Sequence, residues 1–260
     1  MRFAIAGGTG TVGRHTTALA EAAGHEVVLL TRANGHDLSG GGAATGAGSA
    51  TDAPDAIVAA LDGVDAVIDV LGPRGAAAKD AVAFFERTTR TLQRAEEQAG
   101  VPHHVALSIV GAARTAIGYY AGKASQERLV AEGAVPWTIL RTTQFYEFAE
   151  ETAVPFGPWL ISMKMRSQPL AAATVAARLV ALAEAGPAGD APDLAGPQEW
   201  MIAELLREIL RARGTRRRVL ELRVPGRFGR AIAHGAVLPG ADAEIAGPTF
   251  EEWLAASHAA

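Results

Sequence analysis

The sequence predicts an α/β fold: a doubly wound parallel sheet with helices on both faces, followed by a small C-terminal subdomain. Two observations support this prediction. Short apolar runs alternate with longer amphipathic segments from the N-terminus to Arg141. The first apolar run leads directly into a glycine-rich turn and then a helix. Strands that alternate with helices in this way form a parallel sheet with right-handed crossovers.

The first half of the chain contains five apolar runs with the length and composition of buried strands. These runs are Arg2–Ala6, His25–Leu30, Ala66–Val70, Val105–Val110 and Trp137–Arg141. The segments with helical periodicity between them are Gly13–Ala23, Ala53–Leu61, Ala76–Ala99 and Gly118–Glu132. The Gly/Ala/Ser-rich segment Ser39–Thr51 has no apolar periodicity, so we predict a flexible loop inside the domain.

The pattern changes after residue 144. The elements expected there are helices at Thr174–Ala185, Glu199–Ala212 and Phe250–Ala256, a short extended piece at Asp193–Leu194 and a strand at Val219–Val224. We predict that residues 1–144 form the main domain and that residues 145–260 form a smaller region packed on it, within a single compact unit.

The composition excludes several classes of site. The 260 residues include no cysteine, which rules out disulfides, thiol catalysis, iron–sulfur clusters and zinc–thiolate sites. The formal net charge of −4 argues against nucleic-acid binding, and no apolar run has the length of a membrane span. The N-terminus lacks the features of a signal peptide. We expect a cytoplasmic protein with no nucleic-acid or membrane partner and, because its histidines are scattered, no metal.

The turn after the first strand has the pattern of a dinucleotide-binding loop. In FAIAGGTGTVG, the residues Gly7, Gly10 and Gly13 satisfy G-x-x-G-x-x-G. Small residues let the backbone approach a pyrophosphate and let the helix pack closely on the strand. The helix N-terminus offers free N–H groups to the phosphates, and Thr9 and Thr11 add hydroxyl donors. This strand–turn–helix context predicts a Rossmann-type NAD(P)-binding domain.

The end of the second strand indicates which dinucleotide is preferred. NAD-binding domains usually place an acidic residue roughly 20 residues after the glycines, where it binds the ribose 2′-hydroxyl. Here the strand ends in LLTRANG, with Thr31 and Arg32 at that position. A guanidinium forms paired hydrogen bonds with a phosphate, so we predict NADP(H) as the cofactor, with NAD(H) as the weaker ligand. The alternative is that Arg32 is only a solvated surface residue.

A tyrosine and a lysine four residues apart give the most specific chemical signal. Tyr119 and Lys123 share one helix face, and Ser108 lies at the end of the preceding strand. A nearby ammonium lowers the pKa of a phenol, which then donates a proton to a carbonyl while the cofactor donates hydride. A serine hydroxyl polarises the same carbonyl. The alternative is a structural helix with Tyr119 in the core and Lys123 in solvent, and the adjacent Tyr120 complicates the assignment.

Taken together, the motifs resemble a known family. The segments GGTGTVG, LSIVGA, YYAGKASQERLV, WTILRTTQFYEF and TFEEWLA resemble the atypical short-chain dehydrogenase/reductases, in particular the NmrA-like NAD(P)-binding proteins. The resemblance covers nearly the whole chain. It implies a Rossmann fold with a small C-terminal substrate-side subdomain.

The resemblance also implies roles for single residues. The catalytic residues would be Tyr119, Lys123 and Ser108, although the spacing from Ser108 to Tyr119 is slightly short for the family. The cofactor would contact Gly7, Thr9, Gly10, Thr11, Val12 and Gly13 at the pyrophosphate, Arg32 at the 2′-phosphate, Asp37 and Leu38 beside adenine, Leu71, Gly72 and Lys123 at the riboses, and Thr143 near the nicotinamide.

These observations favour an NADPH-dependent oxidoreductase that reduces a carbonyl or activated double bond of a small organic substrate. Phe156 and Trp159 are candidates for an apolar or aromatic substrate wall. The alternatives are a non-catalytic NADP(H)-binding redox sensor, which the same family includes, and an epimerase, dehydratase or cyclase. The sequence leaves the substrate open and allows a monomer or a homodimer. The basic run from Arg211 to Arg218 is interpreted as solvated surface.

Overall fold

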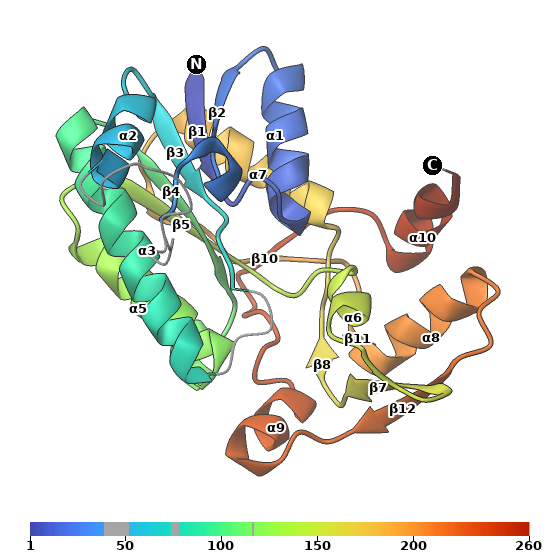
Figure 1. Ribbon diagram of the computed structural model, residues 1–260. Helices are drawn as coiled ribbons and strands as arrows, with labels where there is room; N and C mark the ends of the chain where they lie inside the picture. The colour runs from blue at the N-terminus through green and yellow to red at the C-terminus, as the bar shows by residue number, and fades with distance from the viewer. Residues whose placement is uncertain (39–51, 74–77, 116, 260) are drawn as a thin grey trace. The chain divides into compact units, whose positions relative to one another are not determined.

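The computed structural model describes residues 1–38, 52–73, 78–115 and 117–259, and the chain divides into two compact units (Figure 1). Unit 1 comprises Met1–Ser108, Ala116–Leu140 and Ala176–Ala191. Unit 2 comprises Ile109–Thr115, Arg141–Val175 and Pro192–Ala260. The chain therefore passes between the units several times, whereas the sequence-based prediction places one boundary after residue 144. The predicted flexible loop Ser39–Thr51 lies outside the described residues.

Unit 1 is built on a parallel sheet, as predicted. Its strands are β1 (Arg2–Ala6), β2 (Glu26–Leu30), β3 (Ala66–Asp69), β4 (His104–Ile109) and β5 (Trp137–Thr142), in the order β2-β1-β3-β4-β5. A further short strand, β9 (Gly189–Asp190), pairs with β5 in parallel. Ala6 at the end of β1 is in register with Leu30 on β2 and Asp69 on β3, so the three strands end at the same edge.

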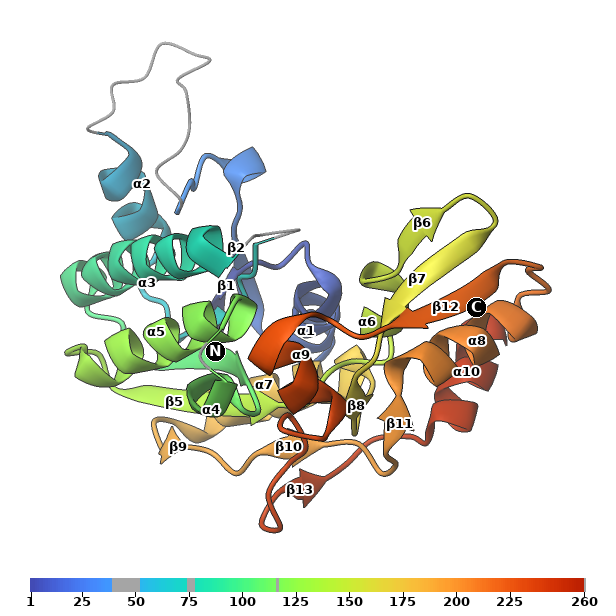
Figure 2. The same cartoon turned by 90° about the horizontal axis from the view of Figure 1, so that it is seen from below.

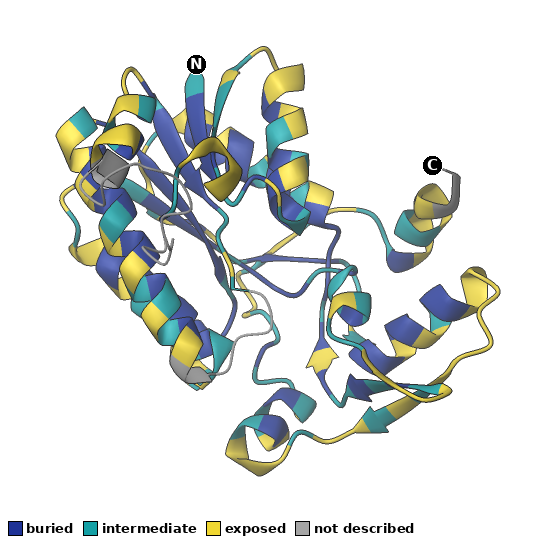
Figure 3. Ribbon diagram, in the orientation of Figure 1, coloured by how far each residue is buried: buried dark blue, intermediate teal, exposed yellow. Residues whose placement is uncertain are grey.

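Helices cover both faces of this sheet, which confirms the predicted Rossmann-like fold. Figure 1 shows α2 (Asp52–Ala60), α3 (Ala78–Ala99) and α5 (Tyr119–Glu132) on one face, and α1 (Thr11–Ala22) and α7 (Ala172–Ala185) on the other. The strands in the middle of this sheet, β1, β3, β4 and β5, are almost entirely buried (Figure 3). One core cluster joins Ala4 and Val67 of the sheet to Ile57 and Leu92 on the helices.

The strand order reverses between β1 and β3, because β2 lies on one side of β1 and the later strands lie on the other. In open α/β sheets, ligands bind at such a switch point, beyond the carboxyl ends of the strands. The segments that leave this edge are the glycine loop after β1 and residues Leu71 and Gly72 after β3.

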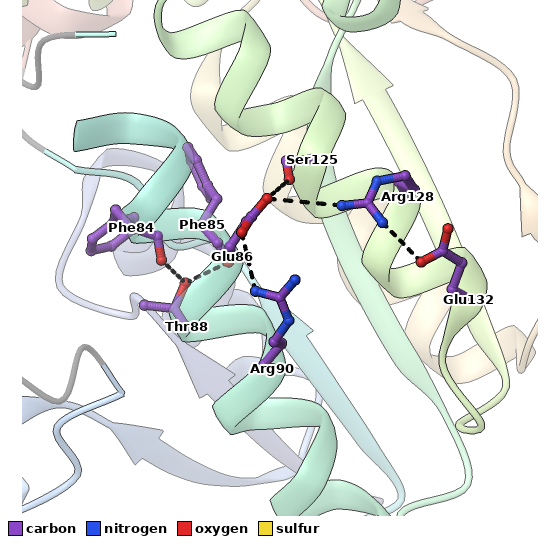
Figure 4. Close-up of polar contacts among 8 residues, drawn as sticks. All are labelled: Phe84, Phe85, Glu86, Thr88, Arg90, Ser125, Arg128 and Glu132. Atoms are coloured by element: carbon purple, nitrogen blue, oxygen red, sulfur yellow. Dashed lines mark hydrogen bonds and ion pairs between the residues drawn. The ribbon is translucent and has the colours of Figure 1, made fainter. Parts of the chain in front are cut away.

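Polar contacts join α3 to α5. The Glu86 carboxylate on α3 accepts a 2.7 Å hydrogen bond from Ser125 on α5 and forms ion pairs with Arg90 (3.1 Å) and Arg128 (3.8 Å) (Figure 4). The hydrogen bond from Ser125 is the largest of the causes that lower the pKa of Glu86 below its ordinary value. These contacts fix the helix that begins with the candidate catalytic tyrosine.

Unit 2 contains three small groups of strands. They are the three-stranded sheet β12-β7-β6 (Arg218–Leu222, Trp159–Met163 and Val154–Phe156), the pair β11-β8 (Trp200–Met201 and Arg166–Ser167), and β10 (Leu194–Ala195), which pairs with Thr142 and with β13 (Glu244–Ile245). Its helices are α4 (Ala112–Thr115), α6 (Phe148–Glu151), α8 (Ile202–Ala212), α9 (Gly226–Ala233) and α10 (Phe250–Ala259). The sequence predicts α8, β12 and α10, but it gives no strand signal for β6 and β7.

Candidate active site

The glycine loop lies between β1 and α1 and is shaped by close backbone contacts. Gly7 has a φ of +88°, and a Cβ at this position would lie 2.9 Å from the carbonyl carbon and oxygen of Val70. A Cβ on Gly13 would lie 2.2 Å from the carbonyl oxygen of Gly7. A side chain therefore fits at neither position unless the backbone moves. The N–H of Gly10 donates a 2.9 Å hydrogen bond to the Gly7 carbonyl, which closes the turn.

The N-terminus of α1 opens onto this loop. The helix begins at Thr11 with Gly10 as its N-cap, and no side chain among the described residues caps it. Its first N–H groups and the positive end of its dipole are the groups that bind phosphate in dinucleotide sites. Thr9 is exposed and Thr11 is half-buried, whereas the Val12 side chain is buried in the core. A glycine-rich turn that ends at an uncapped helix fits the pyrophosphate of a dinucleotide.

Arg32 follows β2 and starts a short 3-10 helix, η1 (Arg32–Asn34). The Thr31 hydroxyl oxygen accepts a 3.3 Å hydrogen bond from the Asn34 N–H and fixes this turn. Arg32 is exposed and forms no ion pair with any residue that the structure describes. Leu38 is 4% exposed and packs in the core, and Asp37 is half-buried.

Tyr119 is the first residue of α5, and its hydroxyl lies at the end of β3. A Cβ built on Gly72 would lie 3.1 Å from the Tyr119 hydroxyl oxygen. The Tyr119 ring packs edge-on against Phe85, with 5.5 Å between the ring centroids. Tyr120 is only 6% exposed, so Tyr119, which is half-buried, is the tyrosine at the strand ends.

Lys123 is buried one turn further along α5, with 3% of its surface exposed. Its ammonium donates hydrogen bonds to the carbonyl of Leu107 (2.7 Å), the side-chain oxygen of Gln126 (2.8 Å) and the carbonyl of Leu71 (3.3 Å). It also lies 4.4 Å from the centroid of the Phe85 ring. The alternative with Tyr119 in the core and Lys123 in solvent is therefore wrong, since the lysine is the more deeply buried of the two.

A buried polar network surrounds this ammonium. Gln126 donates a 2.8 Å hydrogen bond to Asp69 Oδ2, and Asp69 Oδ1 accepts one of 2.9 Å from the Leu71 N–H. Burial lowers the pKa of Lys123 to about 8, although the charges of Asp69 and Glu127 act in the opposite direction. Lys123 thus joins the ends of two strands to the helix, and it is mostly protonated at neutral pH.

The hydroxyl of Ser108 donates a hydrogen bond to Glu127 Oε1, and both residues are buried. The Ser108 hydrogen is therefore directed to the carboxylate, while the oxygen keeps its capacity to accept. Thr143 belongs to unit 2, where its hydroxyl donates a 2.6 Å hydrogen bond to the carbonyl of Gln168. Within unit 1, the structure brings Tyr119, Lys123 and Ser108 to the ends of β3 and β4.

Asp69, Gln126 and Glu127 belong to this cluster and are not among the site residues predicted from the sequence. Two of them had a usable signal: Gln126 and Glu127 lie three and four residues after Lys123, which places them on the same helix face. Asp69 is the one charged residue in the apolar strand AVIDV, and a buried carboxylate requires partners.

No cluster of three or more potential metal ligands occurs within the described ranges. His103 and His104 are buried and bond Thr138 (2.9 Å) and Glu96 (2.7 Å), respectively. In the part of the chain that the structure describes, no helix is long and apolar enough to cross a membrane.

Solved structures with the same fold include several enzymes. NADPH-dependent quinone oxidoreductase QOR2 from Escherichia coli, crystallised with NADPH, has a TM-score of 0.68 at 17% identity and covers 98% of this chain and 99% of its own. The NAD-dependent NDP-hexosamine 5,6-dehydratase TunA has a TM-score of 0.69 at 18% identity, over 98% and 95%. UDP-glucose-4-epimerase from Stenotrophomonas maltophila with bound NAD has a TM-score of 0.66 at 17% identity, over 100% of both chains.

These likenesses establish the fold, and the family follows from the sequence itself. No protein with a curated description matches the chain. The pattern of the family described as NAD(P)H-binding matches residues 7–185, from the first glycine of the loop to the end of α7. The chain therefore belongs to the NAD(P)H-binding family.

Proposed function

We propose that this protein is an NADPH-dependent oxidoreductase that reduces a carbonyl or an activated double bond of a small apolar or aromatic molecule. The observation that carries the proposal is the Tyr119 hydroxyl beside Gly72, on the edge where a dinucleotide lies in this fold. When bound, the reduced nicotinamide supplies a hydride. Tyr119 supplies the proton to the substrate oxygen, or to the carbon of an activated double bond.

In this proposal, Lys123 and Ser108 position Tyr119, because their hydrogen bonds join α5 to the strands β3 and β4. The Lys123 hydrogen bonds to Leu107 and Leu71 hold α5 against the ends of β4 and β3, and thereby orient Tyr119. Its charge also favours the phenolate that remains after proton transfer. Ser108, with its hydrogen on Glu127, offers only its oxygen to a substrate.

The preference for NADPH rests on Arg32, which is exposed at the end of β2 and has no carboxylate partner among the described residues. Arg32→Ala should raise the Kd for NADPH at least tenfold and change the Kd for NADH little, because only NADPH carries the 2′-phosphate. Arg94→Ala, at an exposed arginine of α3, is the matched control. Equal affinities of the wild type for the two nucleotides, or an unchanged preference in Arg32→Ala, would contradict the assignment.

An apolar substrate is supported by the surface of the three-stranded sheet in unit 2. The exposed fractions are 57% for Val154, 66% for Phe156, 39% for Leu220 and 45% for Leu222. The register pairs Phe156 with Trp159 and Leu220 with Ile161, so these side chains share one sheet face. Exposed apolar surface of this kind commonly marks a binding site.

Turnover tests the catalytic role. Purified protein is assayed for NADPH oxidation with a panel of quinones, aromatic aldehydes and enones. Tyr119→Phe should lower kcat by about 10²–10⁴-fold and leave the Kd for NADPH unchanged, since the phenol acts only as a proton donor. Tyr120→Phe removes the neighbouring buried hydroxyl and should keep wild-type kcat. Equal turnover by Tyr119→Phe and the wild type would refute the role of Tyr119.

A non-catalytic NADP(H) sensor is the second candidate, and one observation favours it. The Ser108 hydroxyl hydrogen and all three Lys123 donors are already bonded to protein groups. A sensor would bind NADPH tightly and would oxidise none of it with any compound of the panel. The substitution Tyr119→Phe would change neither the Kd for NADPH nor the absence of turnover. The panel therefore separates the two functions.

A further inference from the structure

Unit 2 contains a hollow of about 370 Å³ between α8 and the start of β12, two elements that lie side by side in Figure 2. Its lining includes four arginines, Arg207, Arg211, Arg217 and Arg218, together with Thr215. The volume lies in the range of small-ligand pockets. Such pockets are mostly apolar, whereas this hollow is lined mainly by cations.

The arginines reach the hollow from two elements. Arg207 and Arg211 are four residues apart on α8 and share a face of that helix. Like charges at this spacing destabilise a helix, so helix stability does not explain why Arg207 is placed beside Arg211. Arg217 directly precedes β12, and Arg218 is the first residue of that strand. The Cζ atom of the Arg218 guanidinium lies 5.6 Å from the centroid of the Trp159 ring.

Nearby carboxylates neutralise only part of this charge. Arg211 pairs with Glu208 on the same helix, and Arg213 pairs with Glu150 at 2.8 Å. Among the described residues, neither Arg207 nor Arg217 forms an ion pair. The dipole of α8 favours cations in its last turn, which accounts for Arg211 and Arg213. Neither the dipole nor ion pairing accounts for Arg207, in the middle of the helix, or for Arg217, beyond its end.

We propose that this hollow binds a diphosphate group. A guanidinium presents a planar fork of donors that matches phosphate oxygens, and it stays charged at every physiological pH. The arginines of α8 line one side of the hollow and those at the start of β12 line the other, so each side can bind one of two linked phosphates. The exposed Thr215 adds a hydroxyl donor. This site is formed by side chains of unit 2, whereas the pyrophosphate site of the glycine loop is formed by the backbone at Gly7–Gly13 of unit 1. It does not depend on the proposed reductase activity.

The test is calorimetric titration of the NADPH-saturated protein with inorganic pyrophosphate at about 0.15 M salt, where exposed charges are screened. Saturation with NADPH keeps the probe from the glycine loop. The variant Arg207→Ala/Arg217→Ala should bind pyrophosphate at least tenfold more weakly than the wild type. The control Arg227→Ala/Arg230→Ala removes two exposed arginines of α9, changes the net charge equally, and should bind as the wild type does.

All three proteins should keep the same Kd for NADPH, which shows that the variants are folded. Two results would overturn the proposal: equal loss of pyrophosphate binding in both double variants, or no binding to the wild type. Succinate, a dianion without phosphate, tests whether the site recognises phosphate rather than negative charge alone. Binding of succinate as tight as that of pyrophosphate would also overturn the proposal. Titration with adenosine 5′-diphosphate shows whether the natural ligand is an esterified diphosphate or the free anion. If adenosine 5′-diphosphate competes with pyrophosphate, the site binds an esterified diphosphate. If it does not compete, the site binds free pyrophosphate.

Discussion

The Ser108 hydroxyl donates a hydrogen bond to a carboxylate oxygen of Glu127. Ser108 lies in β4 and Glu127 in α5, so the bond joins the sheet to the helix that begins with Tyr119. Both side chains are buried, with exposed fractions of 3% and 9%. A buried carboxylate that loses a hydrogen-bond donor keeps the cost of its desolvation.

Ser108→Ala should therefore lower the free energy of unfolding by about 1–3 kcal/mol. Urea denaturation of the wild type, both single alanine variants and the double variant Ser108→Ala/Glu127→Ala gives the coupling energy, which we expect to be about 1 kcal/mol or more. Ser162→Ala is the control, because the buried Ser162 hydroxyl has no hydrogen-bond partner among the described residues. Additive effects of the two substitutions would show that the bond does not stabilise the fold.

The sequence predicts the features of this site that depend on local pattern. The turn at Gly7–Gly13, the shared helix face of Tyr119 and Lys123, and the five strands that position them all follow from spacing and hydrophobic periodicity. Each of these features involves residues only a few positions apart. Local pattern is the information that a single sequence contains most directly.

The main-chain partners of Lys123 could not be predicted in this way. Two of its acceptors are main-chain carbonyls, of Leu107 and Leu71, and every residue has such a carbonyl. Leu71 and Leu107 lie 52 and 16 residues before Lys123 in sequence. Their carbonyls reach Lys123 only because β3 and β4 end at the same edge of the sheet. The strands β6 and β7 have a different explanation. Val154–Met163 contains two prolines and a glycine, which weaken a strand pattern, and the partner strand β12 of β7 lies far along the sequence.

The buried ammonium of Lys123 should make stability depend on pH in the alkaline range. Its pKa is about 8 in the folded chain and about 10.5 when exposed. Between these values the unfolded chain binds one more proton, so the free energy of unfolding rises with pH. Below pH 8 both states are protonated, and above about pH 10.5 neither is.

The variant Lys123→Met isolates this effect, because it keeps a side chain of similar length without the titrating group. From pH 7 to pH 10 the wild type should gain up to about 3 kcal/mol of stability relative to Lys123→Met. Urea denaturation of both proteins at each pH measures the difference. A constant difference, or one that falls as the pH rises, would mean that the pKa of Lys123 is not lowered by folding.

Gly10 and Gly13 should separate stability from cofactor binding. A Cβ on Gly13 would lie 2.2 Å from the carbonyl oxygen of Gly7 and 2.7 Å from the Cα of Gly8, so Gly13→Ala must displace the backbone. Gly10 has a φ of −78°, which alanine adopts readily, and a Cβ there would approach only the Gly7 carbonyl, at 3.3 Å. The rest of that space is open, and it is where the backbone would meet a pyrophosphate.

We therefore expect Gly13→Ala to lower the free energy of unfolding of the cofactor-free protein by about 1–3 kcal/mol, as overpacked sites do. Gly10→Ala should unfold within about 0.5 kcal/mol of the wild type, yet bind NADPH at least tenfold more weakly. Urea denaturation without cofactor and fluorescence titration with NADPH give the two quantities. If Gly10→Ala keeps wild-type affinity, the phosphates do not approach the N-terminus of α1. If it loses affinity and stability together, the loop is a structural turn whose glycines serve the fold.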